Sequence, residues 1–285
     1  MSSTSFPQTN PLESGPLSEI AYAKINLALH VRRRREDGYH ELETFFAFVD
    51  AGDALEVVAA AAGDRLVLSG EFAPLLEDEE GNLVLDALAC LPRGQGWTVS
   101  LDKRLPVAAG LGGGSADVGA VFRLVEAAQG LPADWRTRAA RLGADVPACV
   151  ESVSVIGRGT GTELAPAPAD LAGCPVLLVN PRVPLPTGPV FRGWDGVDRG
   201  PMPEGSAREV AIAGRNDLED SALVLCPAVG EVLGALSQTE AFVVRMSGSG
   251  ATCFALYDDE AACAAAAERI AETHPHWWRL AGRLR

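Results

Sequence analysis

Apolar and polar residues alternate over residues 20–31, where the ordered pattern of the chain begins. Isoleucine, leucine and valine occupy alternate positions of its second half, and Lys24 and Asn26 lie in the same stretch. Because the side chains of a strand alternate between its two faces, the pattern predicts a half-buried strand that carries polar groups toward a site or solvent. The Asp37-Gly38 turn and the apolar run 45–49 then predict a second strand that pairs with the first as a hairpin.

The same reasoning predicts further elements along the chain. Alternating or continuous apolar runs predict strands near 54–58, 65–68, 97–101, 153, 176–179, 242–246 and 252–257. Helical spacing of apolar residues predicts helices near 82–91, 118–125, 133–142, 218–225, 228–236 and 260–273, with Gly143 placed to cap the third. The interleaving of strands and helices is typical of the α+β class.

The length of the chain indicates more than one domain. It has 285 residues, whereas a single domain has about 100–200. We expect an N-terminal domain over 19–157 that carries a glycine-rich loop, and a C-terminal domain over 158–285. The segment 181–205 is dense in proline and glycine and is expected to run over the surface. Residues 1–18 are rich in serine, proline and threonine and are expected to be a disordered tail.

Composition argues against several classes of protein. The formal net charge of -14 argues against nucleic-acid binding, which needs a basic face to displace counterions. No stretch approaches the ~18 uninterrupted apolar residues of a membrane-spanning helix, and residues 1–18 lack the basic start and apolar core of a signal peptide. We therefore expect a cytoplasmic protein that binds neither nucleic acid nor membrane. A phosphorylated ligand has to be bound by a local arrangement of groups.

Cysteine, histidine and arginine clusters point to no further function. The 6 cysteines are scattered without a CxxC pair, which indicates a reducing compartment and neither a zinc nor a redox motif. His274 and His276 stand beside two tryptophans, but nothing completes a metal-coordination set, and no metal bound by protein side chains is expected there. The basic run 32–35 precedes Glu36-Asp37-Gly38 and predicts a solvated hairpin turn.

A glycine-rich segment joins the predicted strand 97–101 to the helix that follows it. Its sequence is Pro106-Val107-Ala108-Ala109-Gly110-Leu111-Gly112-Gly113-Gly114-Ser115-Ala116. Glycine lets the backbone approach a phosphate closely, and the N-terminus of the helix adds a partial positive charge. The segment therefore predicts a phosphate site that needs few cationic side chains.

Two common phosphate motifs do not fit this segment. A Walker loop has a lysine after its last glycine, whereas Ser115 and Ala116 follow Gly114. A dinucleotide fingerprint starting at Gly110 and Gly112 needs glycine or alanine at position 115, which is serine. A loop that only connects two elements is the alternative, but a run of glycines before an amphipathic helix is costly in backbone entropy unless its shape is used.

Several other segments, taken with this loop, resemble the motifs of one enzyme family. They are Ala23-Lys24-Ile25-Asn26-Leu27, Asp37-Gly38-Tyr39-His40, Leu105–Asp117, Leu142-Gly143-Ala144-Asp145-Val146-Pro147, Asn216-Asp217-Leu218-Glu219 and Met246-Ser247-Gly248-Ser249-Gly250-Ala251-Thr252-Cys253. On these segments the chain resembles the GHMP kinases from about Ile20 onward. The Gly-Tyr-His and Gly-Ala-Asp-Val-Pro pairings resemble the branch of the family that acts on a cytidine diphosphate-linked methylerythritol.

The resemblance implies a fold, a reaction and co-substrates. The fold would be the two-domain GHMP kinase fold, with the active-site cleft between the lobes. The reaction would be transfer of the ATP γ-phosphate to the 2-hydroxyl of 4-diphosphocytidyl-2-C-methyl-D-erythritol, in the non-mevalonate (MEP) route to isoprenoid precursors. ATP would be the co-substrate, and Mg²⁺ would accompany it. No other partner is implied, and we expect a monomer or a weak homodimer.

The resemblance also implies roles for individual residues. Asp145 would orient the hydroxyl and help to deprotonate it, with Lys24 beside it. The cytidyl and erythritol parts would be held by Asn26, Tyr39, His40, Thr187 and Phe191. ATP would be bound by residues 106–116, by Asn82 and by Lys103.

From the residues alone, simpler roles and other functions stay open. Asp145 follows Ala144 and precedes Val146-Pro147, so it also fits the N-cap of a helix. Gly248–Gly250 fits either a tight hairpin turn or a second wall of the phosphate site, and we favour the wall. The alternative functions are a GHMP kinase for homoserine or mevalonate and a catalytically silent sensor of ATP. The presence of both Lys24 and Asp145 argues against the sensor.

Overall fold

The strands form two sheets in the part of the chain that the computed structural model describes, residues 15–76 and 81–285. The first sheet has six strands in the order β3-β4-β2-β5-β6, with β1 paired to β2, and the second has four in the order β10-β7-β9-β8. The strands are β1 (Leu17–Arg34), β2 (His40–Ala60), β3 (Arg65–Ser69), β4 (Gly96–Asp102), β5 (Val155–Gly159), β6 (Glu163–Pro166), β7 (Pro175–Asn180), β8 (Val243–Met246), β9 (Cys253–Leu256) and β10 (Trp278–Arg283).

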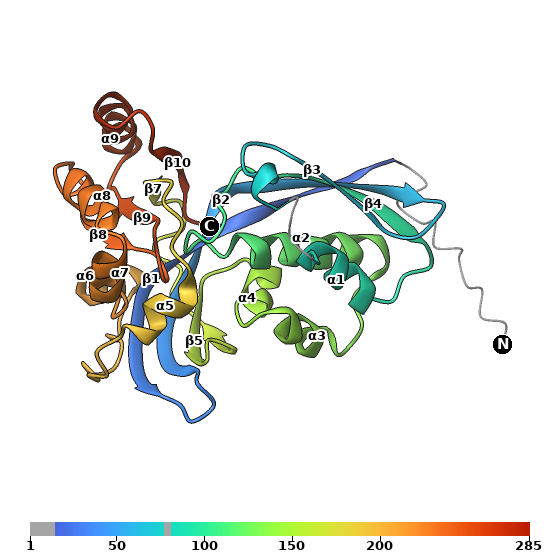
Figure 1. Cartoon of the computed structure of the whole chain (residues 1–285), viewed down its shortest axis with the longest axis horizontal. Helices are drawn as coiled ribbons and strands as arrows, with labels where there is room; N and C mark the ends of the chain where they lie inside the picture. The colour runs from blue at the N-terminus through green and yellow to red at the C-terminus, as the bar shows by residue number, and fades with distance from the viewer. Residues whose placement is uncertain (1–14, 77–80) are drawn as a thin grey trace.

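Helices cover the two sheets at opposite ends of the molecule (Figure 1). They are α1 (Leu83–Cys90), α2 (Gly113–Gln129), α3 (Trp135–Leu142), α4 (Val146–Glu151), α5 (Thr187–Arg192), α6 (Ala207–Ala213), α7 (Glu219–Leu225), α8 (Ala228–Leu236) and α9 (Glu260–Thr273). One hydrophobic core joins α1, α2 and α4 to the first sheet, and another joins α7, α8 and α9 to the second. The interleaved helices and strands confirm the α+β class.

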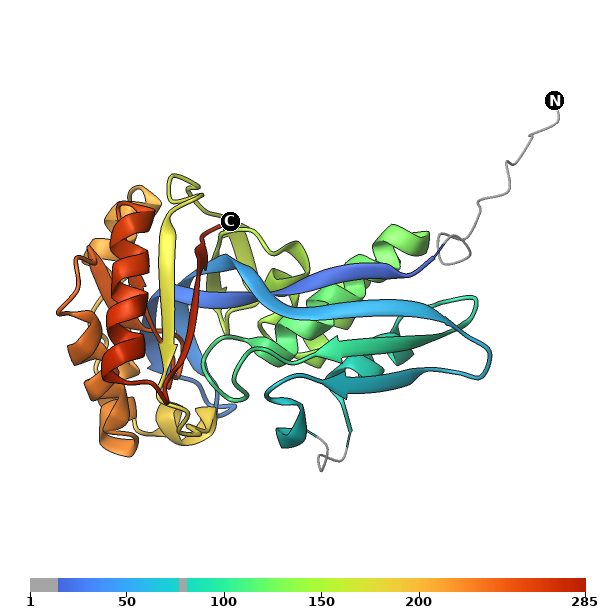
Figure 2. The same ribbon diagram turned by 90° about the horizontal axis from the view of Figure 1, so that it is seen from above.

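The β1–β2 hairpin runs through both halves of the molecule (Figure 2). Its strands have 18 and 21 residues and pair antiparallel along almost their whole length. Side chains on the two faces of β2 enter different cores: Phe46 and Phe48 pack with the helices of the first sheet, whereas Phe45 and Ala47 pack with residues of the second. The hairpin is therefore shared by the two halves.

The hairpin differs from its expected form in the length of its second strand. The runs 45–49 and 54–58, predicted as separate strands, belong to the single strand β2, because Gly52 and Asp53 continue the pairing with β1. The absence of a side chain at Gly52 permits this continuity, since a Cβ there would lie 1.8 Å from the carbonyl oxygen of Ala21.

The burial of β1 also corrects an expectation. The stretch 20–31 was predicted to be half-buried, but Lys24 and Asn26 have only 4% and 2% of their surface exposed, and His30 has 0%. Apolar neighbours of β1 belong to cores on both sides of the hairpin. The polar groups of β1 are therefore buried and must be satisfied within the protein.

Most predicted helices are confirmed, and the differences lie in the second half of the chain. The structure adds α6, which begins with a capping box between Ser206 and Glu209, and β10, which pairs with β7. The segment 181–205 does not merely run over the surface. It contains α5, and it buries Leu185, Val190 and Trp194.

The expected domain boundary between 157 and 158 falls inside β5. Because β5 and β6 both pair within the first sheet, the chain enters the second sheet only at β7. The division into two domains at that point stays a prediction. Of the expected tail 1–18, residues 1–14 lie outside the described residues, and β1 already begins at Leu17.

Two further observations concern the whole described chain. The helices within it are all too short or too polar to cross a bilayer. The cysteines, all of which lie in the described part, are free thiols.

Candidate active site

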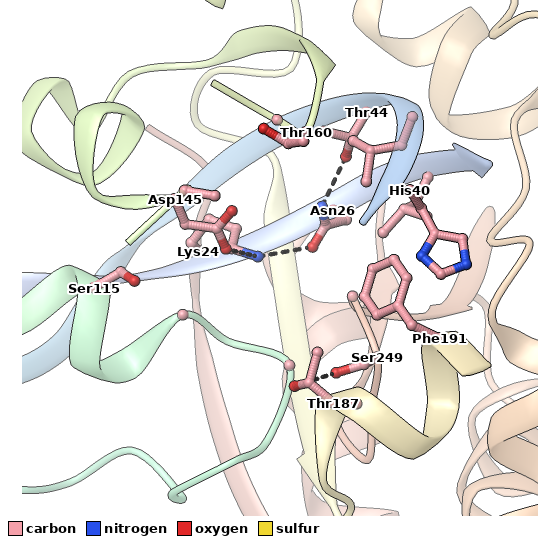
Figure 3. A pocket seen from close by; sticks show the side chains of 18 of the residues that line it. Lys24, Asn26, His40, Thr44, Ser115, Asp145, Thr160, Thr187, Phe191 and Ser249 are labelled. Carbon is pink, nitrogen blue, oxygen red and sulfur yellow. Dashed lines mark hydrogen bonds and ion pairs between the residues drawn. The ribbon is translucent and has the colours of Figure 1, made fainter. Parts of the chain in front are cut away.

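A cavity of about 720 Å³ brings most of the predicted site residues together. It lies between the glycine loop, the β1–β2 hairpin, the start of α4 and the helix α5 (Figure 3). Its predicted lining residues are Lys24, Asn26, Tyr39, His40, Ala108, Ala109, Gly110, Gly112, Gly113, Gly114, Ser115, Asp145, Thr187 and Phe191. Pro106, Val107, Leu111, Ala116, Asn82 and Lys103 do not line it.

Lys24 and Asp145 form an ion pair on the wall of this cavity. Lys24 Nζ lies 3.0 Å from Asp145 Oδ2 and donates a hydrogen bond of 2.9 Å to Asn26 Oδ1. The ammonium also lies 5.2 Å from the centre of the Phe46 ring. The lysine side chain is 5% exposed and that of the aspartate 31%, so the carboxylate is the member of the pair that is open to the cavity.

Asp145 occupies the N-cap position of α4, as its place before Val146-Pro147 suggested. Within the described chain, however, its side chain makes no capping hydrogen bond to that helix. The carboxylate turns instead to Lys24. A capping role for the side chain is therefore wrong, and the position serves to present the carboxylate.

A buried network fixes the orientation of the Asn26 amide. Thr44 Oγ1 donates its only hydrogen to the carbonyl oxygen of Ala28 at 2.8 Å, so it must accept the hydrogen bond of 2.7 Å from Asn26 Nδ2. The amide oxygen of Asn26 then faces Lys24. The sequence did not single out Thr44, since its role depends on the strand register, which places it beside Asn26 across the hairpin.

Left-handed backbone shapes the glycine loop. Gly110 and Gly112 have φ of 75° and 62°, and Gly112 is the N-cap of α2. The first N–H groups of a helix have no partner within it, and the residues that carry three of them here, Gly113, Gly114 and Ser115, line the cavity. The loop and the start of α2 therefore offer backbone donors and the positive end of a helix to an anion.

The members of the predicted ATP segment that do not line the cavity support the loop from behind. Leu111 and Ala116 are buried in the two cores on either side, and Val107 is partly buried and packs against the core that contains Leu111. Asn82 caps α1, because its Oδ1 accepts a hydrogen bond of 2.9 Å from the backbone N–H of Val84. Only the residue after it, Leu83, lines the cavity.

Lys103 lies beneath the glycine loop, bound to two carboxylates. Its Nζ is 2.5 Å from Asp53 Oδ2 and 2.7 Å from Asp117 Oδ2. Asp53 Oδ1 accepts hydrogen bonds from the backbone N–H groups of Arg104 and Leu105, at the entrance of the loop. Burial raises the pKa of Asp117 to about 8. The ammonium of Lys103 is taken up by these carboxylates, its backbone N–H donates to the carbonyl oxygen of Ser69, and its carbonyl oxygen accepts from the N–H of Phe72. Lys103 therefore supports the loop and does not line the cavity.

Aromatic rings form the other end of the cavity. The His40 ring lies 5.1 Å from that of Phe191 and 5.8 Å from that of Trp194, centre to centre. Tyr39 is 65% exposed at the rim. Thr187, at the start of α5, lies 3.0 Å from Ser249 through their hydroxyl oxygens. This end offers flat apolar faces and hydroxyl groups, which suit a base joined to a polar chain.

The turn between β8 and β9 packs against the glycine loop. Gly248 and Ser249 line the cavity, and Ser247 Oγ donates 2.9 Å to the carbonyl oxygen of Gly110. A Cβ on Gly110 would lie 2.2 Å from the carbonyl oxygen of Ser247. Of the two readings of Gly248–Gly250, this contact supports the second wall of the phosphate site.

Other lining residues were not singled out from the sequence, although Gly38 and Ala144 stand inside the segments that resemble the family. They are Leu29, Gly38, Leu42, Thr44, Phe46, Leu83, Ala144, Thr160, Gly161, Gly188 and Arg192. Most are apolar or small and come from five separate segments, so only the tertiary arrangement gathers them.

The chain matches two family models and named proteins of other organisms. The models "GHMP kinases N terminal domain" and "GHMP kinases C terminal" match residues 82–153 and 202–276. A protein of Novosphingobium aromaticivorans named 4-diphosphocytidyl-2-C-methyl-D-erythritol kinase is 66% identical over 271 residues, which are 94% of this chain and 93% of that one. The protein of the same name from Erythrobacter litoralis is 60% identical, over 94% of this chain and 99% of its own.

The chain belongs to the GHMP kinases. Among solved structures, a 4-(cytidine 5'-diphospho)-2C-methyl-D-erythritol kinase matches with a TM-score of 0.79 and 34% identity over 94% of this chain and 99% of its own. A homoserine kinase from Cytophaga hutchinsonii, 16% identical with a TM-score of 0.67 over 98% of this chain and 96% of its own, supports the fold alone. As a GHMP kinase the chain is an ATP-dependent phosphotransferase with an alcohol group as acceptor, as the resemblance implied.

Proposed function

We propose that the chain transfers the γ-phosphate of ATP to the 2-hydroxyl of 4-diphosphocytidyl-2-C-methyl-D-erythritol, a step toward isoprenoid precursors. The main observation behind this proposal is the Lys24–Asp145 pair. It lies between a loop suited to phosphate and a wall suited to a nucleotide base. The names of relatives 66% and 60% identical to this chain support the same substrate.

Each end of the cavity has a part in this proposal. Phosphoryl transfer asks the protein mainly for positioning and for stabilisation of charge. The N–H groups at the start of α2 hold the ATP phosphates without cationic side chains. His40, Phe191 and Tyr39 hold the cytidyl group, and Asn26, Thr187 and Ser249 offer polar groups to the remainder of the substrate.

Asp145 acts on the acceptor hydroxyl. Its Oδ2 is held by Lys24, and the carboxylate is open to the cavity, where it accepts the hydrogen bond of the hydroxyl and takes its proton as the new O–P bond forms. The Lys24 ammonium holds the carboxylate in position, and its positive charge lies next to the developing negative charge. This division of work follows from the unequal burial of the two side chains.

Mg²⁺ fits the cavity as a partner of the ATP phosphates. Among the described residues, no three His, Cys, Asp or Glu side chains gather as a metal site, but Ser115 and Asp145 present a hydroxyl and a carboxylate to the same cavity. Mg²⁺ takes one or two protein carboxylates and completes its shell with phosphate oxygens and water. These two residues would hold the ion, which would neutralise phosphate charge when bound.

We place this reaction in the cytoplasm and in a monomer or weak homodimer. Free cysteines are what a reducing compartment maintains. The groups needed for both substrates lie in a cavity built by a single chain.

Release of ADP in the presence of different acceptors tests the proposal. The cytidyl-linked methylerythritol is expected to support turnover, and homoserine and mevalonate are not. Isothermal titration with the cytidyl compound gives an independent measure of binding. Failure of this compound to bind would refute the substrate assignment, and turnover with homoserine or mevalonate alone would favour another GHMP kinase.

A further inference from the structure

Arg34 and His40 are the last cross-strand pair of the β1–β2 hairpin, at the aromatic end of the cavity. Arg34 Nε donates to His40 Nε2 at 3.4 Å. The same guanidinium donates through Nη2 to the carbonyl oxygens of Arg192 and Trp194, each at 3.3 Å. One exposed side chain thus connects the hairpin, the imidazole and the end of α5. Neither the sequence motifs nor the lining of the cavity includes Arg34.

This contact determines which ring nitrogen of His40 carries the proton. A guanidinium has five N–H donors and no acceptor, so His40 Nε2 must be the acceptor. A neutral imidazole has one donor and one acceptor nitrogen, and its proton then lies on Nδ1. Burial, followed by the charge of Arg34, lowers the pKa of His40 from 6.5, which keeps the ring neutral above that pH.

His40 Nδ1 is available to a ligand. The ring lines the cavity, and among the described residues Nδ1 has no hydrogen-bond partner. An N–H group in this position pairs with an acceptor on a bound base and is poorly matched to a donor. On the Watson–Crick edge, N3 of cytosine is an acceptor, whereas N3 of uracil carries a hydrogen.

We infer that Arg34 is a positioning residue that fixes His40 as an Nδ1–H donor and thereby favours cytosine over uracil in the acceptor substrate. The inference rests on the proposed function for the identity of the base. The geometry itself does not depend on that identity. The Arg34 guanidinium, which can only donate, lies against His40 Nε2 at the turn end of the hairpin.

Arg34 also positions the second ring of this wall. The two carbonyl groups that it binds flank Gly193, where α5 ends, and Phe191 lies in the last turn of that helix. A cation at the C-terminal carbonyl groups of a helix is favourable. Loss of Arg34 would therefore disturb the ring of Phe191 as well, and the test must separate this effect from that on the His40 proton.

The proton position can be measured without any ligand. Long-range ¹H–¹⁵N correlation spectra distinguish the two neutral tautomers of histidine, and the signal of His40 is identified by its loss in His40→Gln. We expect the Nδ1–H form in the wild type and a shift toward Nε2–H in Arg34→Met. Arg33→Met is the matched control, because Arg33 is exposed on the same strand and, among the residues that the structure describes, pairs only with Glu41.

Kinetics then connect the tautomer to base selection. Arg34→Met is expected to raise KM for the cytidyl substrate by roughly 3- to 10-fold, the range of one hydrogen bond, with kcat and KM for ATP little changed. Its preference for the cytidine- over the uridine-linked acceptor should fall by a similar factor. A role limited to packing α5 would weaken both acceptors equally and leave the preference intact.

The outcomes separate this inference from the proposed function. An Nε2–H form in the wild type, an unchanged Nδ1–H form in Arg34→Met, or an unchanged base preference would overturn the role of Arg34. Absence of binding and turnover with the cytidyl compound in the wild type would overturn the proposed substrate, whereas the tautomer measurement would still report on Arg34.

Discussion

Lys24 Nζ lies 3.0 Å from Asp145 Oδ2, although one residue comes from the strand β1 and the other from the start of the short helix α4. The ammonium has Asn26 and the Phe46 ring as its other neighbours and is almost closed off from solvent. The carboxylate remains open to the cavity. In the proposed reaction, Lys24 therefore holds the carboxylate in position, and Asp145 reacts with the substrate.

Replacement of Asp145 by asparagine should abolish acceptance of the hydroxyl proton, while the side chain keeps its size and shape. We expect kcat to fall by about 10²- to 10⁴-fold, the usual contribution of general acid–base catalysis, with little change in KM for the cytidyl substrate. ADP release under saturating conditions measures this. Asp134→Asn is the control, because that exposed carboxylate pairs with Arg138 away from the cavity. A kcat of Asp145→Asn close to that of the control would exclude Asp145 as the base.

Thr44 should matter through a hydrogen bond that its near-isostere valine cannot make. Thr44→Val leaves Asn26 Nδ2 buried without its acceptor, which costs about 1–3 kcal/mol of unfolding free energy, and it frees the amide that faces Lys24. Both the free energy of unfolding in urea and kcat are expected to fall. Thr44→Ser retains the hydroxyl and should stay near the wild type. Equal behaviour of the two variants would show that the hydroxyl is dispensable.

Two glycines of the loop should differ sharply in their tolerance of alanine. At Gly112 the backbone is left-handed and a Cβ would lie 3.0 Å from Lys24 Cε, so Gly112→Ala is expected to lower kcat/KM for ATP by roughly 5- to 30-fold, the equivalent of the 1–2 kcal/mol of left-handed strain. At Gly114, inside α2, the nearest atom is Leu83 Cδ1 at 3.3 Å. Gly114→Ala should stay near the wild type if backbone shape, and not glycine content, is what the loop requires.

Asp117 should make stability fall with rising pH. Its pKa is about 8 in the folded protein and 3.8 ordinarily, so between these values the folded state holds a proton that the unfolded state releases, and the free energy of unfolding decreases as pH rises. Asp117→Asn keeps an acceptor for Lys103 and removes this dependence. We expect the variant to exceed the wild type at pH 9 by at least about 1 kcal/mol.

Urea unfolding at pH 5, 7 and 9 checks the expectation for Asp117. Asp102→Asn, a carboxylate in a more exposed pair with Arg104, is the control. Parallel pH profiles for the wild type and Asp117→Asn would contradict a raised pKa at this position.

The local periodicity of apolar residues was sufficient to predict elements that bury one face against a single core. The apolar spacing Val118, Val121, Phe122 and Val125 predicted α2, and all of these side chains are buried against the first sheet. The strand β10 escaped prediction because its residues alternate weakly, with burial that varies along it. Its existence depends on pairing with β7, distant in sequence.

The site residues that belong to sequence motifs could be predicted. Those that depend on the register between strands β1 and β2 could not. Lys24 and Asp145 stand in segments that resemble a known family. Thr44 and Arg34 act through the pairing of β1 with β2, whose register shifts between Asn26 and Ala28 and again between Val31 and Arg33. Such irregularities decide which side chains meet, and no local pattern in the sequence announces them.

The shared hairpin has a mechanical consequence for turnover. Strands β1 and β2 pass through both halves as one continuous hairpin. Arg285 binds to this hairpin, because its backbone N–H donates a hydrogen bond to the Phe48 carbonyl oxygen. Rotation of one half against the other would have to bend the β1–β2 hairpin near Lys24. We therefore expect substrates to enter and leave by displacement of the turn at Gly38 and of α5, with the reactive pair stationary throughout the cycle.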